Sequence, residues 1–126
     1  MTEPKRYPVP AEILNPEPLR VGALKERLGL TAEELGSAVG RSGRSAARWL
    51  ASEASVPTHG VSAVAIRRLA YLDTLLGDVV GVDRQRSWLR APNPGFRGEA
   101  PIDLISSGRV QEVIAVLELL ADGGPS

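Results

Sequence analysis

The stretch SWLRAPNPGFRGEAPIDLISSG, residues 87–108, is the most specific pattern in this chain of 126 residues. Pro92 and Pro94 push the residues before them toward extended conformations, so a helix is not expected to continue through them. Pro101 stands where a helix tolerates proline, at its first position. We therefore predict a short helix before the first two prolines, an ordered turn, and a second helix from Pro101 to about Ser106.

Two aromatic side chains are expected to shape this turn. Trp88 is predicted to be a core anchor, and Pro92 and Pro94 are expected to hold the conformation of the turn. Phe96 lies between a glycine and an arginine, where it either packs inward or stands exposed for a partner. Asn93 lies between the two prolines.

A second pattern, over residues 31–50, predicts two short helices joined by a tight turn. Thr31 followed by Glu34 forms a capping box that begins the first helix. Ser42 is a suitable N-cap for the second helix. Gly36 is small enough to let the two helices approach closely. This spacing is that of a helix-turn-helix.

The arginines of the second helix are expected on its outer face, where such side chains reach base edges or phosphates. The alternative is a solvated arginine face on a small bundle, or a dimerisation scaffold without a DNA role. The predicted internal contacts are Leu35, Val39, Ala46 and Trp49, and the candidate DNA-binding residues are Arg41, Arg44, Ser45 and Arg48.

The remaining segments show helical periodicity and no strand signal, so the predicted fold is all-α. Residues 1–17 are rich in proline and predict a flexible arm. Residues 18–60 form the predicted helix-turn-helix domain, and residues 61–126 form a second small helical domain. A long apolar helix is expected over 61–79, where it serves either as an interface between copies or as the core between the domains.

The last helix, predicted over 109–121, is apolar on more than one side, which favours a second covering such as a partner chain. Val116 and Leu119 lie off its main apolar face. That main face is predicted to consist of Val110, Val113, Ile114, Leu117 and Leu120.

Charge is balanced overall but unevenly placed. The chain has 15 Lys plus Arg and 15 Asp plus Glu. Five arginines and one acidic residue lie between positions 41 and 68, whereas five acidic residues and one arginine lie between positions 98 and 126. This asymmetry suggests two surfaces with different partners.

Several classes of function lack the residues they need. The chain has no cysteine and one histidine, His59, so no metal site is predicted. It contains neither a nucleophile elbow nor a phosphate-binding loop, and we expect no catalysis and no cofactor. No apolar run reaches the roughly 18 residues of a membrane span, and the N-terminus lacks an apolar signal core. A soluble, cytoplasmic protein is expected.

The residues from Trp88 onward resemble the toxin-binding domain of the Xre/MbcA/ParS antitoxins. The resemblance covers roughly residues 19–123, and a final helix rich in Val, Ile and Leu completes it. Arg48 and Trp49 are similar to the end of the second helix in Xre-type repressors. Arg41, usually apolar in that pattern, and Ala100, usually Ser or Thr, depart from it. The matching residues are Trp88, Leu89, Pro92, Asn93, Pro94, Gly98, Pro101, Asp103 and Leu104.

The resemblance implies the antitoxin of a type II toxin–antitoxin pair. The usual partner in this family is a RES-domain toxin, which consumes NAD or, in some members, ADP-ribosylates a target. The antitoxin blocks the entrance of the NAD pocket, and the complex often represses its own promoter. A homodimer or a higher hetero-oligomer with the toxin is expected. The implied toxin contacts are Asn93, Phe96, Arg109, Glu112, Val116, Leu119, Asp122, Gly123 and Gly124.

A stand-alone helix-turn-helix repressor is the alternative function. It depends on residues 31–50 alone, whereas the antitoxin function depends on the residues from Trp88 onward.

Overall fold

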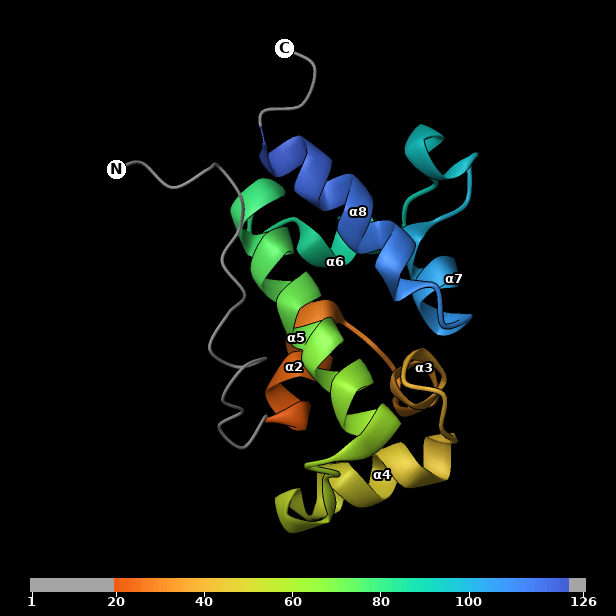
Figure 1. Cartoon of the computed structure of the whole chain (residues 1–126). Coiled ribbons are helices and arrows are strands. Elements are labelled where there is room, and N and C mark those ends of the chain that lie inside the picture. Colours follow the sequence, from red (N-terminus) through yellow and green to blue (C-terminus); the bar gives the residue numbers. More distant parts are fainter. Residues whose placement is uncertain (1–19, 123–126) are drawn as a thin grey trace, which may run out of the picture.

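The computed structural model describes residues 20–122, and this part of the chain is helical, without a strand. The all-α prediction is therefore confirmed. Figure 1 shows the long helix α5 in the middle of the molecule, with α8 crossing it and α3 and α4 near its N-terminal end. The elements are α2 (Val21–Leu28), α3 (Ala32–Ala38), α4 (Gly43–Ala51), η1 (Glu53–Ser55), α5 (Gly60–Val79), α6 (Gln85–Arg90), η2 (Pro94–Phe96), α7 (Pro101–Ser106) and α8 (Val110–Ala121).

Local capping chemistry explains where the short helices begin. The hydroxyl of Thr31 accepts a hydrogen bond from the backbone of Glu34, whose carboxylate accepts one from the backbone of Thr31 in return. Ser42 caps α4 through its side-chain oxygen. Pro101 occupies the first turn of α7, where its missing N–H leaves no helical bond unmade. The predicted helix starts are therefore confirmed at all three places.

The helix-turn-helix geometry depends on one glycine. Gly36 is buried in α3, and a Cβ placed on it would lie 2.3 Å from the carbonyl oxygen of Ser42. Real Cβ atoms do not approach a backbone oxygen this closely, so α3 and the start of α4 can meet only because residue 36 has no side chain. The predicted close approach is confirmed.

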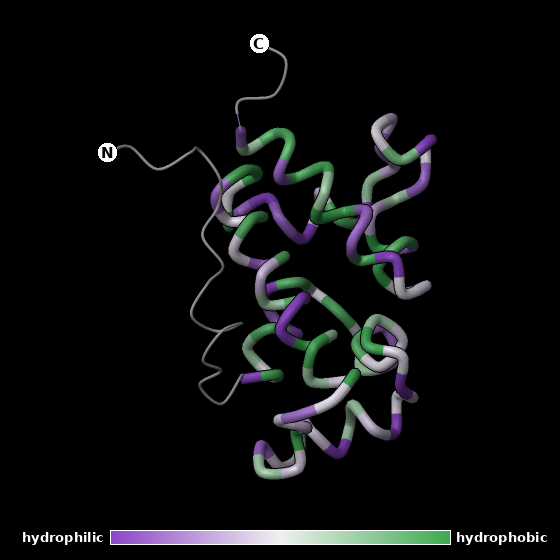
Figure 2. Tube along the Cα trace, viewed as in Figure 1, coloured by the Kyte–Doolittle hydropathy of each residue, from purple (hydrophilic) through white to green (hydrophobic). Residues whose placement is uncertain are grey.

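The hydrophobic core is continuous over the described residues. It runs from Val21 in α2 to Leu117 in α8, and α5 contributes to it along most of its length. Figure 2 shows hydrophobic segments concentrated along α8, whereas α4 carries more hydrophilic positions. Residue 60, the predicted domain boundary, therefore separates two sequence patterns that share one core. The predicted internal residues Leu35, Val39, Ala46 and Trp49 are all buried in it.

Ser45, one of the candidate DNA-binding residues, is buried and does not lie on the exposed face of α4, so its prediction as a DNA contact is wrong. Its side chain is only 8% exposed, and its hydroxyl lies 3.3 Å from that of Ser42. Ser45 precedes the buried Trp49 by four residues, so the two residues share one face of the helix. The four-residue spacing between Ser45 and Trp49 in the sequence is therefore the one feature that indicated the burial of Ser45.

The final helix differs from its predicted pattern at one position. Val110, Val113, Ile114 and Leu117 are buried as predicted, but Leu120 is 48% exposed. Leu120 lies in the last turn of α8 beside the C-terminal end of α5, where it lines a surface hollow together with Val79 and Val80. The main apolar face of α8 therefore ends at Leu117.

Candidate functional site

The turn between α6 and α7 is ordered by its own backbone bonds. Ala91 and Asn93 both adopt the extended conformation expected before a proline. The side-chain oxygen of Asn93 accepts a hydrogen bond of 2.8 Å from the backbone N–H of Gly95, and its backbone carbonyl accepts from Phe96 and Gly98. Asn93 thus has a shaping role in the turn in addition to its predicted partner role.

Phe96 packs inward. Its side chain is 6% exposed, and its ring lies edge-on to Trp88 with 6.2 Å between the ring centroids. Of the two orientations open for Phe96, the structure has the buried one. Trp88 is half-buried and packs against the core as predicted. The contact between the two rings packs the turn against the hydrophobic core.

A surface hollow of ≈ 350 Å³ opens between this turn and α8. We call it the turn hollow. It brings together four of the predicted contact residues from two separate parts of the sequence. The lining residues are Gly95, Phe96, Arg97, Glu99, Leu104, Arg109, Glu112 and Val116. Arg97 and Glu99 were not among the predicted contacts, because an exposed charge in a turn has no distinctive sequence pattern.

An ion pair spans one side of the turn hollow. The guanidinium of Arg109 donates hydrogen bonds of 2.9 and 3.1 Å to the two carboxylate oxygens of Glu112. This bidentate contact lowers the pKa of Glu112 and raises that of Arg109. Both predicted contact residues are therefore charged at neutral pH, and each already has one partner.

The outer face of α8 continues from the turn hollow toward the C-terminus. Leu119 is 62% exposed, and Val116 is partly buried beside the hollow. Asp122 follows the helix as its exposed C-cap residue. Gly123 and Gly124, the last predicted contacts, lie outside the described residues.

A larger and more apolar hollow of ≈ 640 Å³ lies on the other side of Trp88. It is lined by Val79, Val80, Arg84, Ser87, Trp88, Ala91 and Leu120. Sequence periodicity did not reveal it, because it forms only where the ends of three helices meet.

The basic face of α4 lies at the opposite end of the molecule (Figure 1). Arg41, Arg44 and Arg48 are exposed, and none of them forms an ion pair within residues 20–122. Three of the four candidate DNA-binding residues are therefore accessible. The fourth, Ser45, is the buried one.

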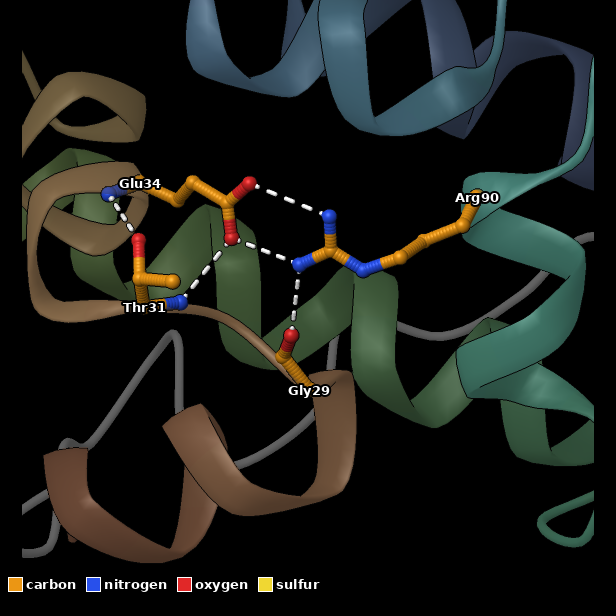
Figure 3. Close-up of polar contacts among 4 residues, drawn as sticks. All are labelled: Gly29, Thr31, Glu34 and Arg90. Carbon is orange, nitrogen blue, oxygen red and sulfur yellow. Dashed lines mark hydrogen bonds and ion pairs between the residues drawn. The ribbon is translucent and has the colours of Figure 1, made fainter.

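A polar contact links the helix-turn-helix to the helix that leads into the turn. Figure 3 shows Arg90 of α6 donating to Glu34, at 2.6 and 3.2 Å, and to the backbone carbonyl of Gly29, at 2.8 Å. Glu34 is also the capping-box residue of α3. The Arg90 hydrogen bond, helped by the backbone N–H of Thr31, holds the pKa of Glu34 below its ordinary value.

Replacing Arg90 with glutamine is expected to reduce the free energy of unfolding by about 1 kcal/mol at pH 7, since the pair is partly exposed. A carboxyl whose pKa is lowered by folding stabilises the protein above its unfolded pKa. That contribution is lost as the pH falls through the lower folded value. The difference between wild type and Arg90→Gln should therefore shrink below the ordinary pKa of 4.5. Urea unfolding at a series of pH values measures it.

Arg86→Gln is the matched control, because Arg86 only approaches Glu26, at 3.9 Å. It should change stability by no more than about 0.5 kcal/mol at any pH. An Arg90→Gln effect of equal size at pH 7 and pH 3 would mean that Glu34 is not the partner that matters.

No group of three or more His, Cys, Asp or Glu residues capable of holding a metal ion occurs within residues 20–122. No helix in the same range is long and apolar enough to cross a membrane.

Similarity to known proteins shows the family of this chain. Residues 72–122 match the family model described as the antitoxin Xre/MbcA/ParS C-terminal toxin-binding domain. The chain is 38% identical over 98 residues to proteins named mycobacterial cidal antitoxin MbcA, from Mycobacterium bovis and Mycobacterium tuberculosis. The match spans 78% of this chain and 85% of each relative.

A solved structure gives the same result. A chain in the crystal structure of the M. tuberculosis MbcT–MbcA toxin–antitoxin complex matches with a TM-score of 0.61 and 36% sequence identity. The match covers 82% of this chain and 92% of that chain. The resemblance noted from Trp88 onward is confirmed, and this chain belongs to the Xre/MbcA/ParS family of antitoxins.

Proposed function

We propose that this antitoxin neutralises a RES-domain, NAD-consuming toxin by covering the entrance of its active site. The outer face of α8, the turn hollow and the C-terminal residues form the proposed contact surface. The chain itself performs no catalysis in this proposal and acts in the cytoplasm. Its relatives named MbcA are antitoxins, and one related structure is of a toxin–antitoxin complex. These findings support a toxin partner, and the surface of α8 supports the manner of binding.

The observation that carries the proposal is the exposed stripe along α8. At about 100° of rotation per residue, positions 112, 115, 116, 119 and 122 fall on one side of the helix. Residues 112, 115, 119 and 122 are exposed, and Val116 is partly buried at the edge of the core, which Val113, Ile114 and Leu117 enter from the other side of the helix. An amphipathic helix that presents a second apolar stripe is a common way for a helix to dock in a partner's groove. Glu112 and Asp122 place a carboxylate near each end of this stripe.

The acidic ends of the stripe fit the proposed target. A pocket that binds NAD must attract the phosphates of its substrate, and basic walls serve that purpose. A helix with carboxylates at both ends and apolar residues between them complements such an entrance.

We also propose that the complex assembles from antitoxin homodimers. Light scattering of the purified complex measures its mass and therefore the number of antitoxin chains in it.

Replacing Leu119 with arginine is expected to weaken toxin binding at least tenfold. The change puts a long cation in the middle of the apolar stripe, where burial in an interface would remove its hydration. Titration calorimetry with the toxin encoded beside this gene measures the affinity, and an NAD-consumption assay measures the lost inhibition. Stability should not change, because Leu119 is 62% exposed.

Val61→Arg provides the matched control. Val61 is 85% exposed in the first turn of α5, and its replacement adds the same charge to the surface outside the proposed contact surface. It should leave toxin affinity within about twofold of wild type. If Leu119→Arg binds as tightly as Val61→Arg, the outer face of α8 is not the contact surface. Full-length variants are preferable to truncations, because the core runs across residue 60.

The accessible arginines of α4 favour a second role, repression of the operon through the helix-turn-helix. Arg41, Arg44 and Arg48 are exposed and lack ion pairs within the described chain. Guanidinium groups that form no ion pair, on the second helix of this motif, can contact phosphates and base edges. This role is compatible with toxin binding at the other end of the molecule. If the protein represses its promoter but binds no toxin, its function is the alternative one, a stand-alone repressor.

Replacing Arg44 and Arg48 together with alanine should weaken binding to the chain's own promoter. If both arginines contact phosphates, the slope of log affinity against log salt should fall by about 2, roughly 0.9 for each contact. A gel-shift series over salt concentration measures the slope. Arg86→Gln on α6 serves as the charge-loss control. Equal slopes for the three proteins would exclude α4 as the DNA-contacting helix.

A further inference from the structure

The backbone of Arg97 is unusual. It is the only non-glycine residue within residues 20–122 with a positive φ, and its φ of 57° and ψ of 33° place it in the left-handed region. An L side chain is strained in this conformation, whereas glycine adopts it freely. The turn after η2 therefore does not require an arginine, and glycine would form it with less strain. A strained residue at a candidate site calls for an explanation in terms of its side chain.

The side chain of Arg97 has no bonded partner. It makes no hydrogen bond or ion pair within the described chain, although it lines the turn hollow. The bonded pair Arg109–Glu112 lies next to it. The pKa of Glu112 is lowered first by its hydrogen bond to Arg109 and further by the charge of Arg97. The guanidinium of Arg97 is thus close to this pair but not part of it.

Charged side chains of both signs line the hollow. Glu99 adds to the raised pKa of Arg109, after the larger effect of Glu112. Because Arg109 and Glu112 are bonded to each other, Arg97 is the cation left available to a partner. Two nearby carboxylates disfavour a polyanion such as nucleic acid, but they leave room for a single acidic group.

The lining of the hollow is partly apolar. Phe96 and Leu104 are buried in its wall, and Val116 faces it from α8. These side chains contribute little to the exposed lining of the hollow, which is mostly polar because Arg97, Glu99, Arg109 and Glu112 provide it. A mostly polar hollow with one unpaired guanidinium fits a protein segment that presents a carboxylate.

We propose that the turn hollow receives an aspartate or glutamate side chain of the toxin and that Arg97 pairs with its carboxylate. The inference rests on the proposed function, and it adds a specific recognition contact that the family resemblance did not supply. The planar guanidinium gives the pair its geometry, because it offers two parallel N–H donors to one carboxylate. Arg97, the residue with the strained backbone, is also one of the residues that line the hollow.

Arg97→Gly separates recognition from folding, because the two properties should change in opposite directions. Loss of the strain should raise Tm by about 2–5 °C. Loss of the ion pair should weaken toxin binding about tenfold. Arg97→Lys keeps the charge without the fork and should lie between wild type and Arg97→Gly. Arg97→Glu reverses the charge and should bind more weakly than Arg97→Gly.

The measurements are thermal unfolding of the free antitoxin and calorimetric titration with the purified toxin, with Arg86→Gln as the control for simple loss of a positive charge. Failure of the wild-type chain to bind the toxin would overturn the proposed function itself. Wild-type binding with unchanged affinity in Arg97→Gly would overturn only the role of Arg97. A fall in both Tm and affinity in Arg97→Gly would overturn it as well, because Arg97 would then support the fold.

Discussion

Gly36→Ala is expected to destabilise the protein by about 3 kcal/mol or more, which corresponds to a fall in Tm on the order of 10 °C. The added methyl would meet the carbonyl oxygen of Ser42 at 2.3 Å, its carbonyl carbon at 2.6 Å and the nitrogen of Gly43 at 3.0 Å. All three atoms belong to the backbone, so no side chain can rotate away. The two helices of the helix-turn-helix must move apart instead.

The intrinsic preference of helices for alanine opposes this effect but is too small to reverse it. Alanine is favoured over glycine in a helix by about 1 kcal/mol. Gly22→Ala isolates that term, because a Cβ on Gly22 in α2 meets only Leu50 Cδ2, at 3.9 Å. This control should stabilise the protein by about 0.5–1 kcal/mol. Thermal and urea unfolding of the two variants measure both effects.

Gly36→Ala is expected to lower the free energy of unfolding and Gly22→Ala to raise it, so the two variants together test the close packing of α3 and α4. If Gly36→Ala is as stable as Gly22→Ala, then α3 and α4 do not pack as closely as the structure shows. The DNA-binding proposal would then lose its helix-turn-helix geometry. The gel-shift experiment with Arg44 and Arg48 would need a different structural explanation.

Phe96→Ala should cost about 3 kcal/mol and weaken toxin binding at the same time. Phe96 is 6% exposed and packs edge-on against Trp88. Truncation of a buried aromatic residue leaves a cavity and removes this ring contact. The same ring forms part of the wall of the turn hollow, so the proposed toxin surface is altered as well. Trp88 should become more accessible to water.

Fluorescence, unfolding and binding distinguish the possible roles of Phe96. The emission of Trp88 should shift to longer wavelength, whereas Trp49, 1% exposed, should not respond. Phe96→Leu is the control, because it keeps most of the volume and should cost no more than about 1.5 kcal/mol. A Phe96→Ala protein of wild-type stability that fails to bind toxin would show that the ring contacts the partner directly and is not a buried anchor.

Local chemistry made much of this structure predictable. The helix starts at Thr31, Ser42 and Pro101 depend on neighbours within three residues, so the sequence contains the whole interaction. The family motif after Trp88 likewise lies in one contiguous stretch. Ser45 is a different case, because its spacing from Trp49 indicated burial and the arginines around it suggested the opposite.

Contacts between distant parts of the chain were not predictable in the same way. The carboxylate of Glu34 was predicted to cap α3, and it does, but it also binds Arg90, 56 positions later. Gln85 is buried and donates to the carbonyl of Arg27 and to Asp73, which also accepts from the side chain of Arg27. No periodicity relates such positions, because each contact depends on how three helices cross.

The candidate site shows the same division. By itself, the sequence determined the all-α fold, the turn after Trp88 and the apolar stripe on the last helix, because capping, proline geometry and helical spacing all act over a few residues. Only the tertiary structure placed that turn against α8, formed the turn hollow, turned Phe96 inward and left Arg97 without a partner. These features require α7 to pack against α6 and α8, and α8 to pack against α5. That packing is set by the burial of apolar surface over the whole chain.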